Sequence, residues 1–198
     1  MYFKTTPGLF IKAFPRFIWK IPSENAIHLT FDDGPHPDTT PYILDKLKTA
    51  GAKGSFFLLG KQAEKYPEIL DQIIQDGHQI AWHGFNHLNG WKTPIKDYIS
   101  NVEKCQHIHS SYYFRPPYGK ITPSQATTLG QNYKIVMWSH MPGDFDARQT
   151  ESSIKSLMNQ VPADGSIVVL HDNQKAIQKC LVALDTILQR EIVFNTLA

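Results

Sequence analysis

Residues 26–59, AIHLTFDDGPHPDTTPYILDKLKTAGAKGSFFLL, contain the unit that decides the fold class. Short runs of β-forming residues at 26–31 and 54–59 flank a helix-length amphipathic stretch at 40–50. A strand, a helix and a second strand in this order predict two parallel strands joined by a crossover helix. We therefore expect a parallel sheet with helices outside it.

The same alternation continues to the end of the chain. Further strands are expected at 78–82, 112–115, 134–138, 166–170 and 191–194, and further helices at 61–76, 94–110, 122–130, 150–160 and 174–189. Seven strands with six helices between them predict an α/β barrel one strand short of eight, and an open doubly wound sheet is the alternative. In both architectures functional side chains lie just beyond the carboxyl ends of the strands.

The composition is that of one ordinary globular domain. The 198 residues carry 20 Lys and Arg against 18 Asp and Glu, a formal net charge of +2, which argues against a nucleic-acid partner. No linker or low-complexity tract marks a second domain. We expect one domain over 25–198, preceded by an N-terminal arm, 1–24.

The arm is rich in Phe, Ile and Leu, but Lys4, Lys12, Arg16 and Lys20 interrupt it. It therefore lacks the continuous apolar stretch of a signal peptide or a membrane-spanning helix. We expect it to pack on the domain, and the alternative is weak association with a membrane surface. With no signal peptide seen, we expect a location in the cytoplasm or, peripherally, at the inner membrane face.

Polar side chains follow the first and third predicted strands. Asp32 and Asp33 end the first strand ahead of a Gly-Pro turn, and adjacent carboxylates are unfavourable unless a cation shares their site. His83 and His87 follow the third strand with a spacing that lets both imidazoles converge. Two imidazoles and one carboxylate make a three-ligand metal site that leaves positions open for water and substrate.

Later strand ends carry further polar residues. Arg115 opens the segment Arg-Pro-Pro-Tyr-Gly, whose prolines and glycine predict an irregular loop with a free backbone N–H near Tyr118. His171 ends the sixth strand, and residues 138–146 after the fifth strand contain two carboxylates. Polar chemistry at five strand ends is difficult to attribute to chance.

Four motifs in this order resemble the polysaccharide deacetylase family, also known as carbohydrate esterase family four or the NodB-homology domain. They are Thr-Phe-Asp-Asp-Gly, His-x-x-x-His, Arg-Pro-Pro-Tyr-Gly and Leu-His, and the resemblance runs from about residue 25 to the C-terminus. It implies a distorted (β/α)7 barrel, which agrees with the seven strands counted independently, and a catalytic domain over 25–198.

The resemblance also implies a role for each matching residue. The implied metal ligands are Asp33, His83 and His87. The implied catalytic groups are Asp32 as general base, Arg115 as the residue that holds this base, the backbone N–H of Tyr118 as oxyanion donor, and His171 as general acid. The resident metal is expected to be one divalent ion, zinc first, with Co, Ni or Mn as alternatives.

Two departures from the family pattern affect the surroundings of these residues. Gly84 follows the first metal histidine, where the family usually has Ser or Thr. The fourth motif, usually Asp-x-x-Asp-Trp, reads Met-Pro-Gly-Asp-Phe at 141–145. We expect Asp144, in preference to Asp146, to orient His171.

The expected activity is that of a hydrolase of carbon–nitrogen amide bonds other than peptide bonds. It removes N-acetyl groups from amino sugars of a polysaccharide or oligosaccharide that is chitin-like or peptidoglycan-like. One alternative is an O-acetyl esterase or a deacylase of a lipid-linked sugar. Another, from a different class, is a non-catalytic relative that only binds carbohydrate. The sequence does not predict the oligomeric state.

Overall fold

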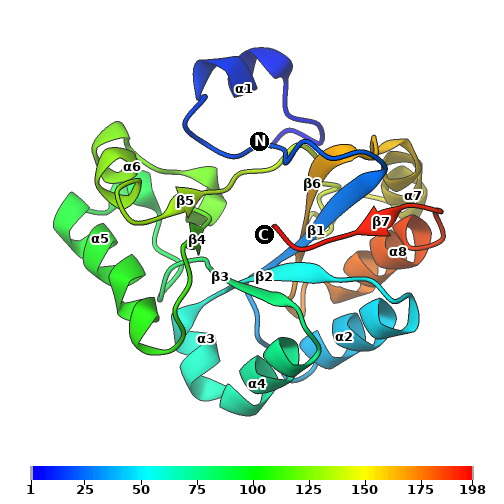
Figure 1. Cartoon of the computed structure of the whole chain (residues 1–198), viewed down its shortest axis with the longest axis horizontal. Coiled ribbons are helices and arrows are strands. Elements are labelled where there is room, and N and C mark those ends of the chain that lie inside the picture. The colour runs from blue at the N-terminus through cyan, green and yellow to red at the C-terminus, as the bar shows by residue number, and fades with distance from the viewer. Residues whose placement is uncertain (1, 198) are drawn as a thin grey trace.

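The structure, a computed structural model, describes residues 2–197 and has a parallel sheet at its centre (Figure 1). The seven strands are β1 (Ala26–Asp32), β2 (Gly54–Leu58), β3 (Gln79–Trp82), β4 (Tyr113–Phe114), β5 (Lys134–Ile135), β6 (Asp164–His171) and β7 (Val193–Phe194). Each corresponds to a strand predicted from the sequence. Met1 and Ala198, the ends of the predicted arm and domain, lie outside the described residues.

The order of the strands is that of a barrel. It runs β5-β4-β3-β2-β1-β6, with β7 also paired to β1, and every pair is parallel. A bridge between His140, beyond β5, and Val168 of β6 connects the two edges. The distorted (β/α)7 barrel is therefore confirmed, and the open doubly wound sheet is wrong.

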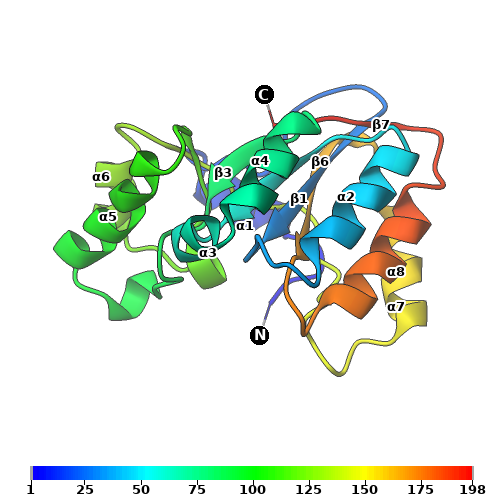
Figure 2. The same ribbon diagram turned by 90° about the horizontal axis from the view of Figure 1, so that it is seen from below.

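Helices surround the strands. They are α2 (Thr40–Thr49), α3 (Gly60–Lys65), α4 (Pro67–Gln75), α5 (Ile95–Glu103), α6 (Pro123–Leu129), α7 (Glu151–Gln160) and α8 (Ile177–Ile187), with 3-10 turns at Gly90–Lys92, Lys104–His107 and Pro117–Gly119. Figure 2 shows α2, α7 and α8 along one flank of the barrel and α5 and α6 along the other. Most of the predicted helices are found within a few residues of their expected ends.

Two predicted helices are shorter than expected. The stretch 61–76 is not one helix, because Tyr66 has φ −129° and ψ 61° and separates α3 from α4. The following proline, Pro67, disfavours the helical conformation at Tyr66 but is well suited to the first turn of α4. The stretch 94–110 is helical only to Glu103 and then tightens into the 3-10 turn. The helix end expected at Gly77 is present, with φ +76° at this glycine.

The alternation of side chains along β1 brings polar groups into the barrel. Ile27, Leu29 and Phe31 are fully buried in the large apolar cluster beneath the helices. Thr30 and Asp32 point to the opposite face, where both accept hydrogen bonds from Arg115. The carboxyl end of the barrel therefore has a polar interior.

The C-terminal segment closes the other end of the barrel. Leu197 packs inside it, in a small cluster with Phe57, Ala81, Val136 and Ile167. Gln79 Oε1 accepts a hydrogen bond from the Leu197 N–H at 3.0 Å, and the hydroxyl of Tyr113 donates to the Leu197 carbonyl at 3.2 Å. Figure 1, which looks along the barrel, shows the C-terminus at its centre. The opposite end is thus the open one.

The N-terminal arm lies beside the gap between β5 and β6. Ile18 pairs with Val136 and Lys20 with Ser166, so the arm bridges the two edges of the sheet. It contains the short helix α1 (Gly8–Ala13), at the edge of the molecule in Figure 1. Within residues 2–197 the chain forms no helix with both the length and the apolar character required to cross a bilayer.

Candidate active site and metal centre

The first strand ends in a tight turn that requires a glycine. Asp33 has φ +82°, and the next residue, Gly34, lies so close to Asp172 that an added Cβ would overlap its carboxylate. Asp172 is fully buried and accepts hydrogen bonds from the hydroxyls of Thr39, at 2.5 Å, and Thr40, at 2.6 Å. These contacts fix the turn that presents Asp33 at the barrel mouth.

Asp33, His83 and His87 meet at one point of that mouth. Each offers one ligand atom, and the three atoms lie within 4.8 Å of one another. His87 Nε2 is 3.4 Å and His83 Nε2 is 3.9 Å from Asp33 Oδ1. The structure therefore brings together the three residues predicted as metal ligands.

Neighbouring groups turn the free atoms of this triad toward their common centre. His83 Nδ1 donates a hydrogen bond to the carbonyl of Arg115, at 2.8 Å. The unprotonated Nε2 is therefore the atom that is free to bind a metal. Burial, followed by repulsion from His87, lowers the pKa of His83 to about 3, so its imidazole is neutral. Asn173 Nδ2 donates to the second oxygen of Asp33 at 2.8 Å. A neutral, oriented imidazole and a held carboxylate fit a first-row divalent cation.

The loop between the two histidines is held by a residue that the sequence did not single out. Gly84 has φ +78°, a conformation that disfavours the serine or threonine usual in the family. Asn101 of α5 supplies hydrogen bonds instead, since its Oδ1 accepts from the N–H groups of Phe85 at 3.0 Å and Asn86 at 3.3 Å. The loop is thus supported by a side chain from another element, α5.

Asp32 and Arg115 form a buried ion pair behind the triad. Arg115 is fully buried, and its Nη1 donates to Asp32 Oδ1 at 2.6 Å and to Thr30 Oγ1 at 2.8 Å. Its other nitrogens donate to main-chain carbonyls, so Arg115 binds the carboxylate through one nitrogen and not in a bidentate manner. The second oxygen, Asp32 Oδ2, lies 3.8 Å from His83 Nε2 and faces the metal position.

Tyr118 adopts the left-handed conformation expected of the irregular loop, with φ 61° and ψ 8°. Among residues 2–197, no acceptor is hydrogen-bonded to its backbone N–H, whereas the next two residues bond back to Pro116 and Pro117. Its ring stands edge-on to His87 at 4.5 Å between centroids. The free N–H therefore belongs to a residue that contacts the triad.

His171, which ends β6 beside Asp32 of β1, is held by Asp144. Its Nδ1 is 2.8 Å from Asp144 Oδ1, and its backbone N–H donates to Asp144 Oδ2 at 2.7 Å. Burial disfavours the charged imidazole, but the Asp144 charge and hydrogen bond, with help from Asp33 and Asp32, outweigh it and raise the pKa of His171 to about 9. His171 is therefore an imidazolium at neutral pH.

The alternative partner of His171, Asp146, serves another purpose. It binds the guanidinium of Arg148 and accepts a hydrogen bond from the hydroxyl of Tyr2 at 3.2 Å. The position of the family's usual tryptophan carries Phe145, whose ring lies edge-on to His171 at 4.7 Å. An aromatic contact on the histidine is thus retained.

Besides Asn101, two further positioning residues were missed in the sequence, Asp172 and Asn173. Both directly follow His171, so the run His-Asp-Asn at the end of β6 was the signal that could have identified them. Asp172 supports the Gly34 turn, and Asn173 holds Asp33. Each acts through another residue of the site.

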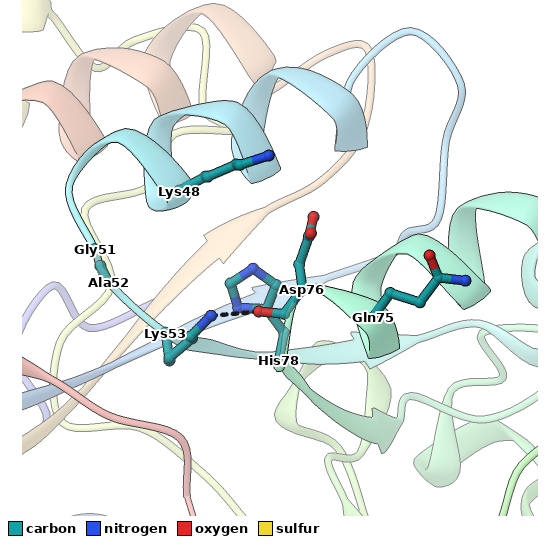
Figure 3. A pocket seen from close by; sticks show the side chains of 7 residues that line it. All are labelled: Lys48, Gly51, Ala52, Lys53, Gln75, Asp76 and His78. Carbon is teal, nitrogen blue, oxygen red and sulfur yellow. Dashed lines mark hydrogen bonds between the residues drawn. The ribbon is translucent and has the colours of Figure 1, made fainter.

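A cavity of about 310 Å³ lies away from this site (Figure 3). Its lining includes Lys53, Asp76 and His78, and the ammonium of Lys53 donates to the carbonyl of Asp76. Lys53 precedes β2 and His78 precedes β3, so the cavity is at the amino ends of the strands. It has no part in the metal centre.

Comparison with known proteins agrees with these motifs. A family model described as polysaccharide deacetylase matches residues 20–135 of the chain. The chain belongs to the polysaccharide deacetylase family. A peptidoglycan-N-acetylglucosamine deacetylase of Bacillus cereus is 36% identical over 171 residues, which cover 82% of this chain but 62% of that relative.

Two further relatives are covered more fully. A chitooligosaccharide deacetylase of Azorhizobium caulinodans is 34% identical over 158 residues, 76% of this chain and 75% of that protein. A crystal structure of a peptidoglycan N-acetylglucosamine deacetylase in complex with 4-naphthalen-1-yl-N-oxidanyl-benzamide superimposes with a TM-score of 0.86 at 32% identity, covering 97% of this chain and 95% of that one. The predicted membership of the polysaccharide deacetylase family is confirmed.

Proposed function

We propose that this polysaccharide deacetylase homologue is a metal-dependent hydrolase that removes N-acetyl groups from amino sugars of a peptidoglycan-like or chitin-like glycan. One observation carries the proposal: beside the triad of Asp33, His83 and His87 stand two groups of opposite proton affinity, Asp32 and His171. The names of the relatives, which act on peptidoglycan and chitooligosaccharides, support the same substrate class.

Asp33 and the Nε2 atoms of His83 and His87 would hold the metal ion, and zinc is our first choice. Two imidazoles and one carboxylate are a common ligand set of catalytic zinc, although cobalt, nickel and manganese accept the same donors. When bound, such an ion supplies Lewis acidity that polarises the acetyl carbonyl and lowers the pKa of water. Metal analysis of the purified protein tests the choice of zinc.

Asp32 is the proposed general base. Its Oδ1 is committed to Arg115, which leaves Oδ2 free to take the proton of the attacking water. The fully buried guanidinium compensates the carboxylate charge and fixes its orientation. Arg115 therefore acts as a positioning residue for the base.

The Tyr118 N–H is the proposed oxyanion donor, because it is unpaired within the described chain and belongs to a residue in contact with His87. A donor of this kind typically contributes about 3–4 kcal/mol to the stability of the transition state. His171 is the proposed general acid. It gives its proton to the sugar nitrogen as the carbon–nitrogen bond breaks, and acetate and a free amine result.

The protonation of His171 favours amide over ester hydrolysis. An amine leaves poorly without a proton, and in the metal-free protein the pKa of His171, raised to about 9, keeps that proton on the imidazole at neutral pH. An O-acetyl esterase depends less on such an acid. Two exposed rings on the metal side, Trp91 and Tyr118, offer flat surfaces that suit the faces of sugars.

Acetate release is the decisive assay. The protein, stripped with a chelator and reloaded with one metal at a time, is offered chitooligosaccharides, peptidoglycan fragments, acetylated xylan and an acylated lipid-linked sugar. We expect acetate from the first two substrates, loss of activity on stripping and recovery with zinc. Faster release from xylan would favour the esterase, and undiminished activity after stripping would contradict the metal-dependent mechanism.

The non-catalytic alternative predicts a different result. A protein that only binds carbohydrate would retain affinity for chitooligosaccharides without releasing acetate in the presence of any metal. The complete set of Asp32, His171 and the triad supports the enzyme instead. A location in the cytoplasm or at the inner membrane face stays a prediction, which cell fractionation tests.

A further inference from the structure

Exposed apolar side chains are concentrated in the N-terminal arm. Four of the twelve large hydrophobic residues that are exposed in the described chain fall between residues 3 and 14. They are Phe3, Leu9, Phe10 and Phe14, with Leu9 81% exposed. The other eight are spread over the remaining domain. An apolar patch gathered on one short segment is typical of an interaction surface.

The rings of the patch pack against one another and against one buried ring, that of Trp19. Phe10 contacts Phe3, Phe14 and Trp19, with centroids 5.1 to 6.0 Å apart. Trp19 is only 5% exposed, and its Nε1 donates to the carbonyl of Phe14 at 3.0 Å. The outward rings are therefore fixed in place before any partner binds.

The charged side chains of residues 2–21 in the arm are all cationic. Residues 2–21 contain four cationic side chains and no Asp or Glu. Lys4 donates to Ser153, and Lys20 pairs with Asp164. Within residues 2–197, Lys12 and Arg16 make no ion pair or side-chain hydrogen bond, and both are exposed. Two cations thus stand free beside the apolar patch.

We propose that this arm binds to an anionic phospholipid surface, with Leu9, Phe10 and Phe14 inserted among the acyl chains and Lys12 and Arg16 on the headgroup phosphates. Aromatic and apolar residues next to free cations are the composition of segments that lie in the membrane interface. With six residues, α1 is about 9 Å long and would lie in the interface plane.

A second copy of the chain is a less suitable partner for the same surface. Two arms packed face to face would bring Lys12 and Arg16 of one copy against the same cations of the other, because residues 2–21 hold no acidic residue. Lipid phosphates, by contrast, complement both charges. The inference does not depend on the deacetylase activity.

The arm would also fix the orientation of the domain on such a surface. The N–H of Thr6 donates to the carbonyl of Ser139 at 2.8 Å, and the N–H of Met141 donates to the carbonyl of Lys4 at 2.9 Å. These bonds tie the arm to the segment that leads to Asp144. The arm that would contact the membrane is therefore hydrogen-bonded to the segment that carries a residue of the active site.

Vesicle sedimentation with the full chain tests the proposal. We expect binding to vesicles of phosphatidylcholine with a third of phosphatidylglycerol, and little binding to phosphatidylcholine alone. The variant Lys12→Gln with Arg16→Gln should bind about 20- to 30-fold more weakly, since the two cations contribute about equally to the affinity for an anionic surface. Leu9→Ser with Phe10→Ser should weaken binding at least about tenfold.

The matched control replaces an exposed aromatic residue elsewhere. Tyr112, 69% exposed and outside the arm, can be changed to Ser, and this variant should bind like the wild type. Thermal unfolding of every variant shows that the domain is intact. Equal binding by all variants, no binding to anionic vesicles, or a dimer that is lost on Leu9→Ser would overturn the proposal.

Discussion

Asp32 and His171 are direct partners across β1 and β6, so their side chains emerge side by side on the same face of neighbouring strands. Each is held by a residue of opposite charge, Asp32 by Arg115 at 2.6 Å and His171 by Asp144 at 2.8 Å. One group is thus arranged to accept a proton and the other to donate one.

Asp32→Asn should remove the base and leave the metal centre in place. The amide keeps the size of the carboxylate but cannot take a proton from water. We expect kcat to fall at least about 100-fold, the lower range for a general base. Metal content, measured on the same sample, should equal that of the wild type. A variant as fast as the wild type would contradict the assignment of Asp32.

His87→Ala should remove metal and activity together. His87 supplies one of only three ligand atoms, and its Nε2 is 3.4 Å from Asp33 Oδ1. His171→Ala is the matched comparison, because it should keep the metal and lose only the proton donor. If both variants retained metal equally, the triad would not be the metal centre.

The sequence was sufficient to predict which residues come together as the proposed metal triad, but not those that support them. Strand periodicity and four motifs predicted the barrel and the placement of Asp33, His83 and His171 at strand ends. Asn101 was not identified because it lies within helix α5, where a polar side chain is ordinary and does not indicate a role in the site. The break at Tyr66 was missed because the apolar periodicity of 61–76 continues through it, although Pro67 was visible.

Asn101→Ala should loosen the histidine loop. The side chain of Asn101 accepts both the Phe85 and the Asn86 N–H, and such supporting contacts are typically worth about 10- to 100-fold in metal affinity. We expect zinc affinity to fall by about this range, as measured by competition with a chelating dye. Gly84→Ser, which restores the family's usual choice, should not rescue it, because φ is +78° there.

Asp144→Asn should change how the protein responds to pH. The folded pKa of His171, about 9, lies above its ordinary value of 6.5, so protonation stabilises the fold. This contribution is fully present below pH 6.5 and is lost as the pH rises through 9. The Tm difference between wild type and variant should therefore be largest below pH 6.5 and shrink toward pH 9.

These Tm measurements belong to metal-free protein, since a bound cation would itself repel the imidazolium. As the pH is raised, activity of the reloaded Asp144→Asn variant should begin to decline at a lower pH than that of the wild type. The reason is that His171 loses its proton at a lower pH without the Asp144 charge. Asp146→Asn is the control, as Asp146 contacts Arg148 and Tyr2 and not His171. An identical shift in both variants would argue against a specific role of Asp144.

Trp91→Ala should affect long substrates more than short ones. The ring of Trp91 is 66% exposed in the turn that follows the metal-binding loop, and its Nε1 donates to the Ile121 carbonyl at 3.3 Å. Ile121 lies just beyond Tyr118, so the loops that carry the two rings are in contact. A fixed, exposed ring of this kind can stack on a sugar next to the one that loses its acetyl group.

An aromatic contact is worth about 0.5–1.5 kcal/mol, so we expect Trp91→Ala to raise the KM for chitotetraose about 3- to 10-fold. The KM for a small acetyl ester, which cannot reach the ring, should not change. Trp91→Phe should restore part of the loss, and Tyr112→Ala, in an exposed ring before β4, should behave like the wild type. Equal losses on both substrates would assign Trp91 to the stability of the loop and not to the recognition of the glycan.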